Sequence, residues 1–231
     1  MRIGIVIPAH NEELFLPDCL QSLQAFIDAG DTVLVVDAGS TDQTADIAVR
    51  EEATVIASAS SARGTAVSLG IERLLAQGEP PDVILIAHAD MIFPREARSD
   101  LIDALEHTPD CPGGCFGHRI RARGLFFRVV ERGNRMRATQ LQMPYGDQAQ
   151  FFRPTVLPAI HGFPRQEWLE DFELALRLRA VGTLLYLPHP VEIPARHWES
   201  GKIGTTLRNW RTIWRYLRQR KNSLLDFPKP A

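Results

Sequence analysis

Acidic and small polar residues gather where three of the predicted strands end. The strands predicted at 3–8, 32–37 and 83–88 each lead into such residues, and open α/β sheets bind their ligands at this carboxyl edge. Carboxylates and hydroxyls accept hydrogen bonds from a nucleotide base and ribose, whereas bare phosphate needs N–H groups and cations. The candidates for a base-and-ribose site are Asn11, Glu12, Asp37, Ser40, Asp42 and Asp90.

Asp90 offers a way to hold the phosphates of such a nucleotide. Mg²⁺ and Mn²⁺ prefer oxygen ligands and bridge phosphate oxygens, so a cation bound by Asp90 would serve a diphosphate. A second interpretation stays open, because an aspartate here could also cap the following helix or form a turn.

Other nucleotide and metal motifs are absent or incomplete. No G-x-G-x-x-G follows the first predicted strand and no G-x-x-x-x-G-K-[ST] occurs, which excludes the dinucleotide fingerprint and the P-loop. Cys111 and Cys115 in CPGGC supply only half of a zinc site. Three cysteines, an odd and low number, favour a reducing cytoplasm over a disulfide scaffold.

The elements that position these residues alternate between strand and helix. Apolar runs predict strands at 3–8, 32–37, 53–58 and 83–88. Helical spacing and caps predict helices at 12–30, 40–52, 64–78 and 95–107. This alternation predicts an α/β fold with an open, mostly parallel twisted sheet and helices on both faces.

The rhythm changes after residue 110. We predict strands at 115–123, within 144–154 and at 183–188, and helices at 124–140, 169–182 and 200–221. The chain is therefore divided into a nucleotide-binding half (1–110), a half of the same domain that meets the nucleotide's cargo (111–199), and a basic C-terminal helix with its tail (200–231).

The composition is that of an ordinary globular protein. The 231 residues are 45% hydrophobic and 23% charged, with a net charge of −2, which argues against wholesale disorder and against a dedicated nucleic-acid binder. No apolar run approaches the roughly 20 residues of a spanning helix. The N-terminus enters a strand at once, so we predict no signal peptide and a cytoplasmic location.

The chain resembles the family 2 glycosyltransferases, which have the GT-A fold. The segments that carry the resemblance are IVIPAHNEE, VVDAGSTDQTADIA, HAD, GDQAQFFRP and EWLEDFELALRLRAVG, in this order along nearly the whole chain. Together, HAD, YGDQ and ARHWESGKIGTTLRNW are most similar to a small bacterial subfamily, the arsenosugar-biosynthesis-associated glycosyltransferases.

The resemblance implies a role for each candidate residue. Asp37 would read the base edge of the nucleotide, and Asp171 in LEDFE would be the general base. The nucleotide and its pyrophosphate would contact Pro8, Asn11, Glu12, Asp37, Ser40, Asp42, Arg63 and Gly64, with Ser40 and Asp42 shaping the turn. The donor sugar or acceptor would lie near Gly146, Asp147, Gln148 and Glu170, and the metal ligands would be Asp90, His88 and His197.

Two departures from the family pattern bear on these roles. His88 stands where the family commonly has the first acid of a D-x-D motif, and imidazole is a weaker ligand for a hard cation. The dependence on Mn²⁺ or Mg²⁺ is therefore open, and His197 would either complete the metal or diphosphate site or be a packed or surface histidine. No Q-x-x-R-W follows the base, which predicts a non-processive enzyme.

The reaction implied is an inverting transfer from a nucleoside-diphosphate sugar, expected to be UDP-linked, to a small-molecule or lipid-linked acceptor. The cation would neutralise the leaving diphosphate while Asp171 takes the proton of the acceptor hydroxyl. A nucleotidyltransferase would instead need a Gly-rich basic loop after the first strand, and PAHNEELF has none. A degenerate, nucleotide-binding non-enzyme is a further alternative, which His88 motivates.

The C-terminal region is strongly basic. From 196 to 221 only Glu199 opposes Arg196, Lys202, Arg208, Arg211, Arg215, Arg218, Arg220 and Lys221. A helix here would carry an apolar stripe with two tryptophans beside a row of arginines, and the 124–140 helix repeats this pattern. The tail could pack on the sheet, pair with a second subunit or lie in a membrane interface. We favour packing with peripheral contact to the inner face of a membrane, and no nucleic-acid partner.

Overall fold

The chain divides into two units, Met1–Ile193 and Pro194–Ala231. The structure is a computed structural model that describes residues 1–198 and 201–223. The first unit contains all of the strands and all of the candidate site residues except His197.

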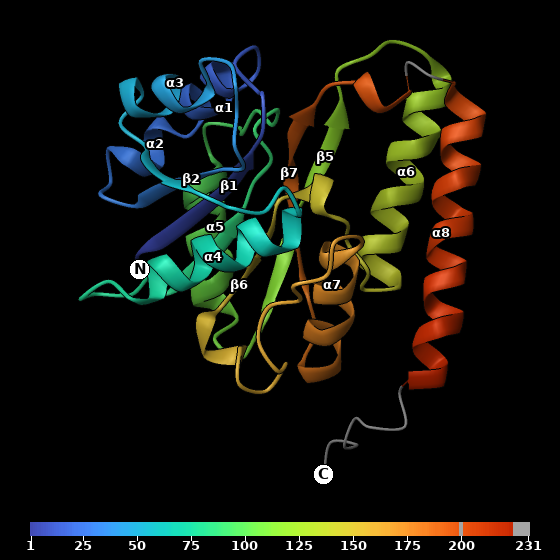
Figure 1. Ribbon diagram of the computed structural model, residues 1–231. Helices are drawn as coiled ribbons and strands as arrows, with labels where there is room; N and C mark the ends of the chain where they lie inside the picture. Colours follow the sequence, from blue (N-terminus) through green and yellow to red (C-terminus); the bar gives the residue numbers. More distant parts are fainter. Residues whose placement is uncertain (199–200, 224–231) are drawn as a thin grey trace. The chain divides into compact units, whose positions relative to one another are not determined.

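One seven-stranded sheet forms the centre of the first unit, in the order β3-β2-β1-β4-β6-β5-β7 (Figure 1). Strand β6 runs antiparallel to its neighbours β4 and β5, and the other paired strands are parallel. The predicted open, mostly parallel sheet is confirmed. The strands are β1 (Ile3–Ala9), β2 (Thr32–Asp37), β3 (Thr54–Ala57), β4 (Val83–Ile86), β5 (Gly113–Ile120), β6 (Gln150–Phe152) and β7 (Leu185–Ile193).

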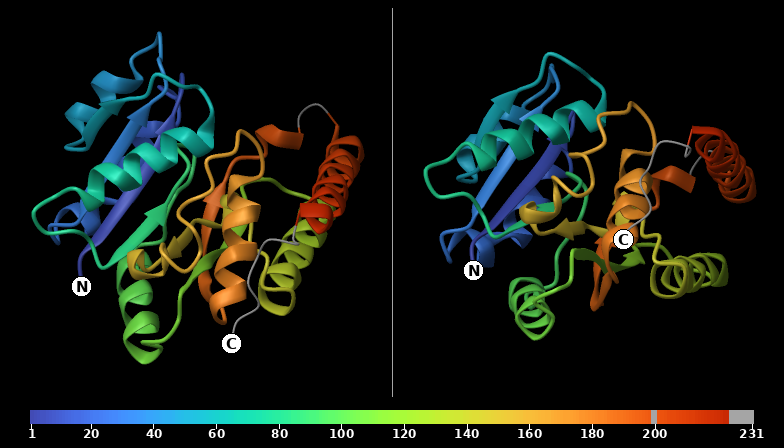
Figure 2. Two further views of the ribbon diagram at one scale, coloured as in Figure 1. Left: turned by 60° about the horizontal axis from the view of Figure 1, so that its bottom comes forward. Right: turned by 90° about the horizontal axis from the view of Figure 1, so that it is seen from below.

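Helices cover both faces of this sheet, as predicted (Figure 2). Phe152 lies in the core beneath α4 and α7 with Val67 and Leu174. Its neighbour Phe151 points to the other face, where its ring meets Phe116 edge to face at 6.1 Å, because successive side chains of a strand alternate. The helices of this unit are α1 (Leu16–Ser22), α2 (Gln24–Ile27), α3 (Thr44–Arg50), α4 (Arg63–Leu75), α5 (Ala97–His107), α6 (Leu125–Gln140) and α7 (Glu170–Val181).

The single helix predicted at 12–30 is wrong, because the segment forms two short helices, α1 and α2, and its first residues form a turn. The backbone N–H of Glu12 donates to the Thr44 hydroxyl at 2.8 Å, and that of Glu13 donates to the Asp42 carboxylate at 3.2 Å. The N–H groups of Glu12 and Glu13 therefore bind side chains of the 42–44 segment. Helix α1 begins only at Leu16.

Strand β7 runs beyond the predicted 183–188. It continues through Pro188 and Pro190 to Ile193 and pairs with β5 at the end of the sheet. Proline lacks the N–H that a central strand needs, but an edge strand tolerates it. The pairing shifts register between Phe116 and Gly117, whose partners are Leu187 and Pro190, which marks a bulge in β7.

The second unit contains a short 3₁₀ helix, η3 (Arg196–Trp198), and the long helix α8 (Lys202–Ser223). The helix predicted at 200–221 is thus present, and the guanidinium of Arg218 lies 5.4 Å from the Trp214 ring centroid within it. Among residues 1–198 and 201–223, no helix combines the length and apolar character needed to cross a bilayer.

Candidate functional site

The loops after β1 and β2 are joined by hydrogen bonds. Asn11 has a φ of 55°, which asparagine tolerates, and its N–H donates to the Ser40 hydroxyl at 2.9 Å. The Asn11 side-chain oxygen accepts from the Thr41 N–H at 2.8 Å. Ser40 in turn donates its hydroxyl to Asp37 at 2.5 Å. Asp37 is thereby held, half-buried, at the carboxyl edge of the sheet beside the end of β1.

Asp42 fastens the start of α3 to the loop after β1. Its carboxylate accepts from the Thr44 N–H at 3.0 Å and from the Glu13 N–H at 3.2 Å. Desolvation raises the pKa of Asp42, but the hydrogen bonds from Thr44 and Glu13 outweigh it and lower the pKa below its usual value. Asp42 therefore fixes the conformation of this loop, while Pro8 lies half-buried in β1 at the same edge.

His88 and Asp90 lie in the turn after β4. The Met91 N–H and the Cys19 thiol both donate to the His88 carbonyl, at 3.2 and 3.4 Å. Burial, with the charges of Asp90 and then Glu12, raises the pKa of the Cys19 thiol, so both carboxylates are near this sulfur and the ends of β1 and β4 meet there. Asp90 is only 4% exposed. It does not cap the next helix, because α5 begins without a side-chain cap.

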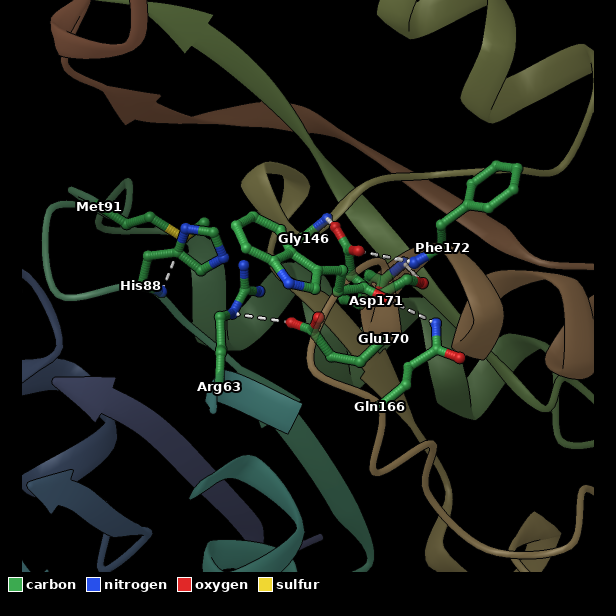
Figure 3. Close-up of polar contacts among 10 residues, drawn as sticks. Arg63, His88, Met91, Gly146, Gln166, Glu170, Asp171 and Phe172 are labelled. Carbon is green, nitrogen blue, oxygen red and sulfur yellow. Dashed lines mark hydrogen bonds and ion pairs between the residues drawn. The ribbon is translucent and has the colours of Figure 1, made fainter. Parts of the chain in front are cut away.

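The loop before β6 and the start of α7 converge on one point of the site (Figure 3). The Asp171 carboxylate accepts the Gly146 N–H at 2.5 Å and the Phe172 N–H at 2.8 Å. A Cβ built on Gly146 would lie 2.9 Å from Asp171 Oδ2 and 3.0 Å from His88 Nε2, and still closer to the Arg63 guanidinium. Four segments of the chain therefore bring Arg63, His88, Gly146 and Asp171 together.

Arg63 and Glu170 form an ion pair across this point, with Nε and Oε1 3.0 Å apart. Glu170 is 4% exposed; burial raises its pKa, Arg63 opposes that rise, and the Asp171 charge adds to it. Gly64 lies next to Arg63, where a Cβ would collide with the Gln166 carbonyl. Glycine at position 64 therefore allows the start of α4 to approach the 164–166 loop. Arg63 lies between Glu170, its ion-pair partner, and Gly146.

The predicted sugar-side residues Asp147 and Gln148 occupy different environments. Gln148 is fully buried, and its amide donates to the Phe116 carbonyl at 3.5 Å and accepts from Arg137 at 3.3 Å. Gln148 therefore braces the loop and has no surface left for a substrate. Asp147 is half-buried, and its Oδ1 accepts no hydrogen bond from the described residues. Of the two, Asp147 is the better candidate for a substrate contact.

Sequence comparison decides the family. Residues 4–165, more than half of the chain, match the family described as Glycosyl transferase family 2. The chain belongs to glycosyl transferase family 2. The family indicated by the sequence motifs is thus confirmed, whereas no curated protein matched the chain.

Solved structures with the same fold accompany this family 2 assignment. TarS from S. aureus in complex with UDP-GlcNAc is 16% identical, with a TM-score of 0.66, over 85% of this chain and 59% of that one. PcManGT, a mannosyltransferase from Pyrobaculum calidifontis in complex with GDP-Man and Mn²⁺, is 17% identical, with a TM-score of 0.69, over 99% and 66%. Glucosyl-3-phosphoglycerate synthase from Mycobacterium tuberculosis, in complex with Mn²⁺, UDP and glucosyl-3-phosphoglycerate, is 19% identical, with a TM-score of 0.58, over 84% and 70%. The chain thus spans about three fifths of the TarS 1–349 chain and 37% of the longer TarS chain.

A cation at the site of this family 2 protein would need ligands from a bound phosphate as well as from the chain. In the described part of the chain, no three His, Cys, Asp or Glu residues group closely enough to hold a metal ion by themselves. The turn after β4 offers one carboxylate, Asp90, and one imidazole, His88. Mg²⁺ is commonly held in this way, by one or two protein ligands together with substrate phosphates and water. The side chain of His197 lies outside the described residues.

Three residues of the site escaped sequence reasoning. The buried Gln150 amide donates to the Pro144 carbonyl at 3.0 Å and to the Asp171 carbonyl at 2.9 Å, which fastens the two loops of the family 2 site together. Ala149 and Leu169 adopt the left-handed region, with φ of 43° and 59°, a conformation that costs a non-glycine residue about 1 kcal/mol or more. All three lie within the quoted motifs GDQAQFFRP and EWLEDFELALRLRAVG, but a motif does not reveal these contacts and conformations, because tertiary contacts impose them.

Proposed function

We propose that this chain is an inverting, non-processive glycosyltransferase that moves a sugar from a nucleoside-diphosphate sugar to an acceptor hydroxyl. The observation that carries the proposal is the Asp171 carboxylate, oriented by the Gly146 and Phe172 N–H groups beside Arg63 and His88. The family 2 membership supports it.

The nucleotide would bind over the ends of β1 and β2. Asp37 is half-buried there, and its carboxylate suits the N3–H donor of a uracil edge, which is why UDP is the favoured nucleotide. The Asn11–Ser40–Thr41 hydrogen bonds keep this edge in one shape, and a pre-shaped site loses less entropy on binding.

The leaving diphosphate would lie between Arg63 and the turn after β4. The Glu170 carboxylate holds the Arg63 guanidinium in place, with Nε and Oε1 3.0 Å apart. A positively charged side chain is therefore positioned before the donor binds. A divalent cation held by Asp90 and His88 would supply further neutralisation of the phosphate charge.

Asp171 is the proposed general base. Two backbone N–H groups orient its carboxylate, which lies in the first turn of α7. It would remove the proton of the acceptor hydroxyl as that oxygen attacks the anomeric carbon from the face opposite the diphosphate. The attack inverts the anomeric configuration.

The acceptor side contains Asp147 and an exposed indole. Trp168 is 78% exposed and stands close before Glu170 and Asp171 in the chain, so its ring is available to a sugar or another partly apolar acceptor. A small-molecule and a lipid-linked acceptor both fit this description. The assignment to the arsenosugar-biosynthesis-associated subfamily stays a prediction that rests on the sequence motifs.

Donor binding and turnover test the proposal together. UDP and UDP-sugars, with and without Mn²⁺, should raise the thermal midpoint by mass action. Asp171→Asn should keep that shift while turnover falls on the order of 10²–10⁴-fold. Glu167→Gln changes an exposed acid of the preceding loop in the same way and should leave turnover unchanged.

Three results would contradict the proposal. A thermal shift with nucleoside triphosphates alone would point to nucleotidyl transfer, and donor binding without turnover of any sugar would indicate a non-enzymatic protein. Asp171→Asn at half of the wild-type rate would remove Asp171 as the base.

A further inference from the structure

Helix α6 exposes an apolar stripe on the first unit. Leu125, Val129 and Met136 are 79%, 62% and 55% exposed, and their helical spacing places them on one side of the helix. The opposite side of the helix is anchored, because Phe127 and Ala138 are buried. An exposed stripe of three large apolar side chains beside an anchored face points to a binding partner.

The surroundings of this stripe are strongly cationic. The segment 119–141 contains seven arginines and one acid, Glu131, and Glu131 pairs with Arg128 at 2.8 Å. The exposed arginines beside the stripe are Arg121, Arg123, Arg132 and Arg135. The partner should therefore be anionic and should also accept apolar side chains.

Helix α8 in the second unit has the same character. Trp214 is 64% exposed, and Arg211, Arg215 and Arg218 are exposed as well. The sequence 201–223 has no acidic residue. Taken by itself, α8 therefore also suits an anionic surface that accepts apolar side chains.

We propose that the α6 stripe and its arginines bind the surface of an anionic lipid bilayer. Apolar side chains at the headgroup boundary and arginines at anionic lipids act together in such helices. Nucleic acid would satisfy the arginines but leave Leu125, Val129 and Met136 in water. The lipid bilayer is the partner that satisfies both parts of the surface.

The surface is linked to the candidate site by Arg137, on the same helix. Its guanidinium stacks on the Tyr145 ring at 3.1 Å and binds Gln148 at 3.3 Å, next to Gly146. Insofar as the proposed function holds, a bilayer at α6 would favour the lipid-linked acceptor. The binding surface itself does not depend on that function.

Vesicle flotation of the full-length protein tests the proposal. The protein should float with phosphatidylglycerol-rich vesicles at low salt, float less at high salt and float little with phosphatidylcholine alone. Val129→Glu should weaken binding roughly tenfold, because it removes an apolar contact and adds a negative charge, and Arg132→Gln should weaken it about fivefold.

The matched controls lie on α3. Val49→Glu changes a valine of similar exposure, 64%, and Arg50→Gln an exposed arginine beside it; both should bind vesicles like the wild type. The Val129→Glu protein should keep the wild-type thermal midpoint and UDP affinity, since the residue is exposed. Loss of flotation with these two quantities unchanged supports the membrane surface.

Several outcomes would overturn the proposal. These are absence of flotation with anionic vesicles at low salt, wild-type flotation of Val129→Glu, and equal loss in the α3 controls. Binding to RNA without binding to vesicles would assign the surface to nucleic acid. A change of sedimentation coefficient on Val129→Glu without vesicle binding would assign it to a second copy of the chain.

Discussion

Gly146→Ala tests the candidate site with the smallest possible change. The added Cβ would enter the space between three groups, 2.9 Å from Asp171 Oδ2, 3.0 Å from His88 Nε2 and closer to Arg63. Ordinary contact begins at 3.4 Å, so the carboxylate oxygen would have to move by about 0.5 Å and the imidazole nitrogen by about 0.4 Å. The backbone of Gly146 lies outside the left-handed region, so alanine adds no backbone strain.

These displacements set the expected loss of activity. A misplacement of about 1 Å can cost about 100-fold in rate, so half of that distance predicts a loss on the order of tenfold. The hydrogen bond from the Gly146 N–H to Asp171, 2.5 Å long, would also weaken, and bonds to charged groups contribute about 1.5–3 kcal/mol. We expect turnover to fall by roughly 10–100-fold and UDP affinity to fall as well, because Arg63, the proposed diphosphate contact, must also move. The thermal midpoint should change little.

The assay is release of the nucleoside diphosphate at saturating donor, with Gly133→Ala as the control. A Cβ at Gly133 meets nothing within 4 Å, so this variant should keep its turnover and gain about 0.5–1 kcal/mol of stability as a helical alanine. Wild-type turnover of Gly146→Ala, measured beside an unchanged control, would refute the convergence of Asp171, Arg63 and His88 as the catalytic arrangement.

Three further predictions concern the nucleotide, the cation and pH. Asp37→Ala should weaken UDP binding by roughly 10–100-fold, the loss of one charge-assisted hydrogen bond, and calorimetry showing wild-type affinity would remove Asp37 from the nucleotide site. His88→Asp adds a hard anionic ligand and should lower the Mn²⁺ concentration at half-maximal donor binding by roughly tenfold; an unchanged Mn²⁺ titration would separate His88 from any cation. Asp100 lies 2.6 Å from the His189 ring and raises the pKa of His189 above 6.5. The ion pair therefore stabilises the folded state fully below pH 6.5, and this stabilisation is lost as the pH rises through the raised pKa. The midpoint difference between wild type and His189→Gln should therefore be largest in acid and vanish in alkali, and a difference independent of pH would contradict this assignment.

The order of strands and helices follows from the sequence alone. The apolar runs 32–37 and 83–88 are local signals, and β2 and β4 appear at these places because short β-branched runs must be buried in a sheet. The acids at the strand ends were predictable for the same reason, since parallel strands bring their carboxyl ends to one edge. The family could also be predicted from the sequence, because each of its motifs is a contiguous segment of the chain.

Only the tertiary structure decided how these residues meet. Gln148 was expected at the sugar, but it is fully buried as a brace for the loop, and burial depends on long-range packing that no local pattern encodes. The pairing of Arg63 with Glu170 joins α4 to α7 across more than 100 residues of sequence. Gly146 shows the limit most clearly: its neighbours are Arg63, His88 and Asp171, three residues from three other segments, and only the folded sheet brings them within 3.0 Å of one Cβ position.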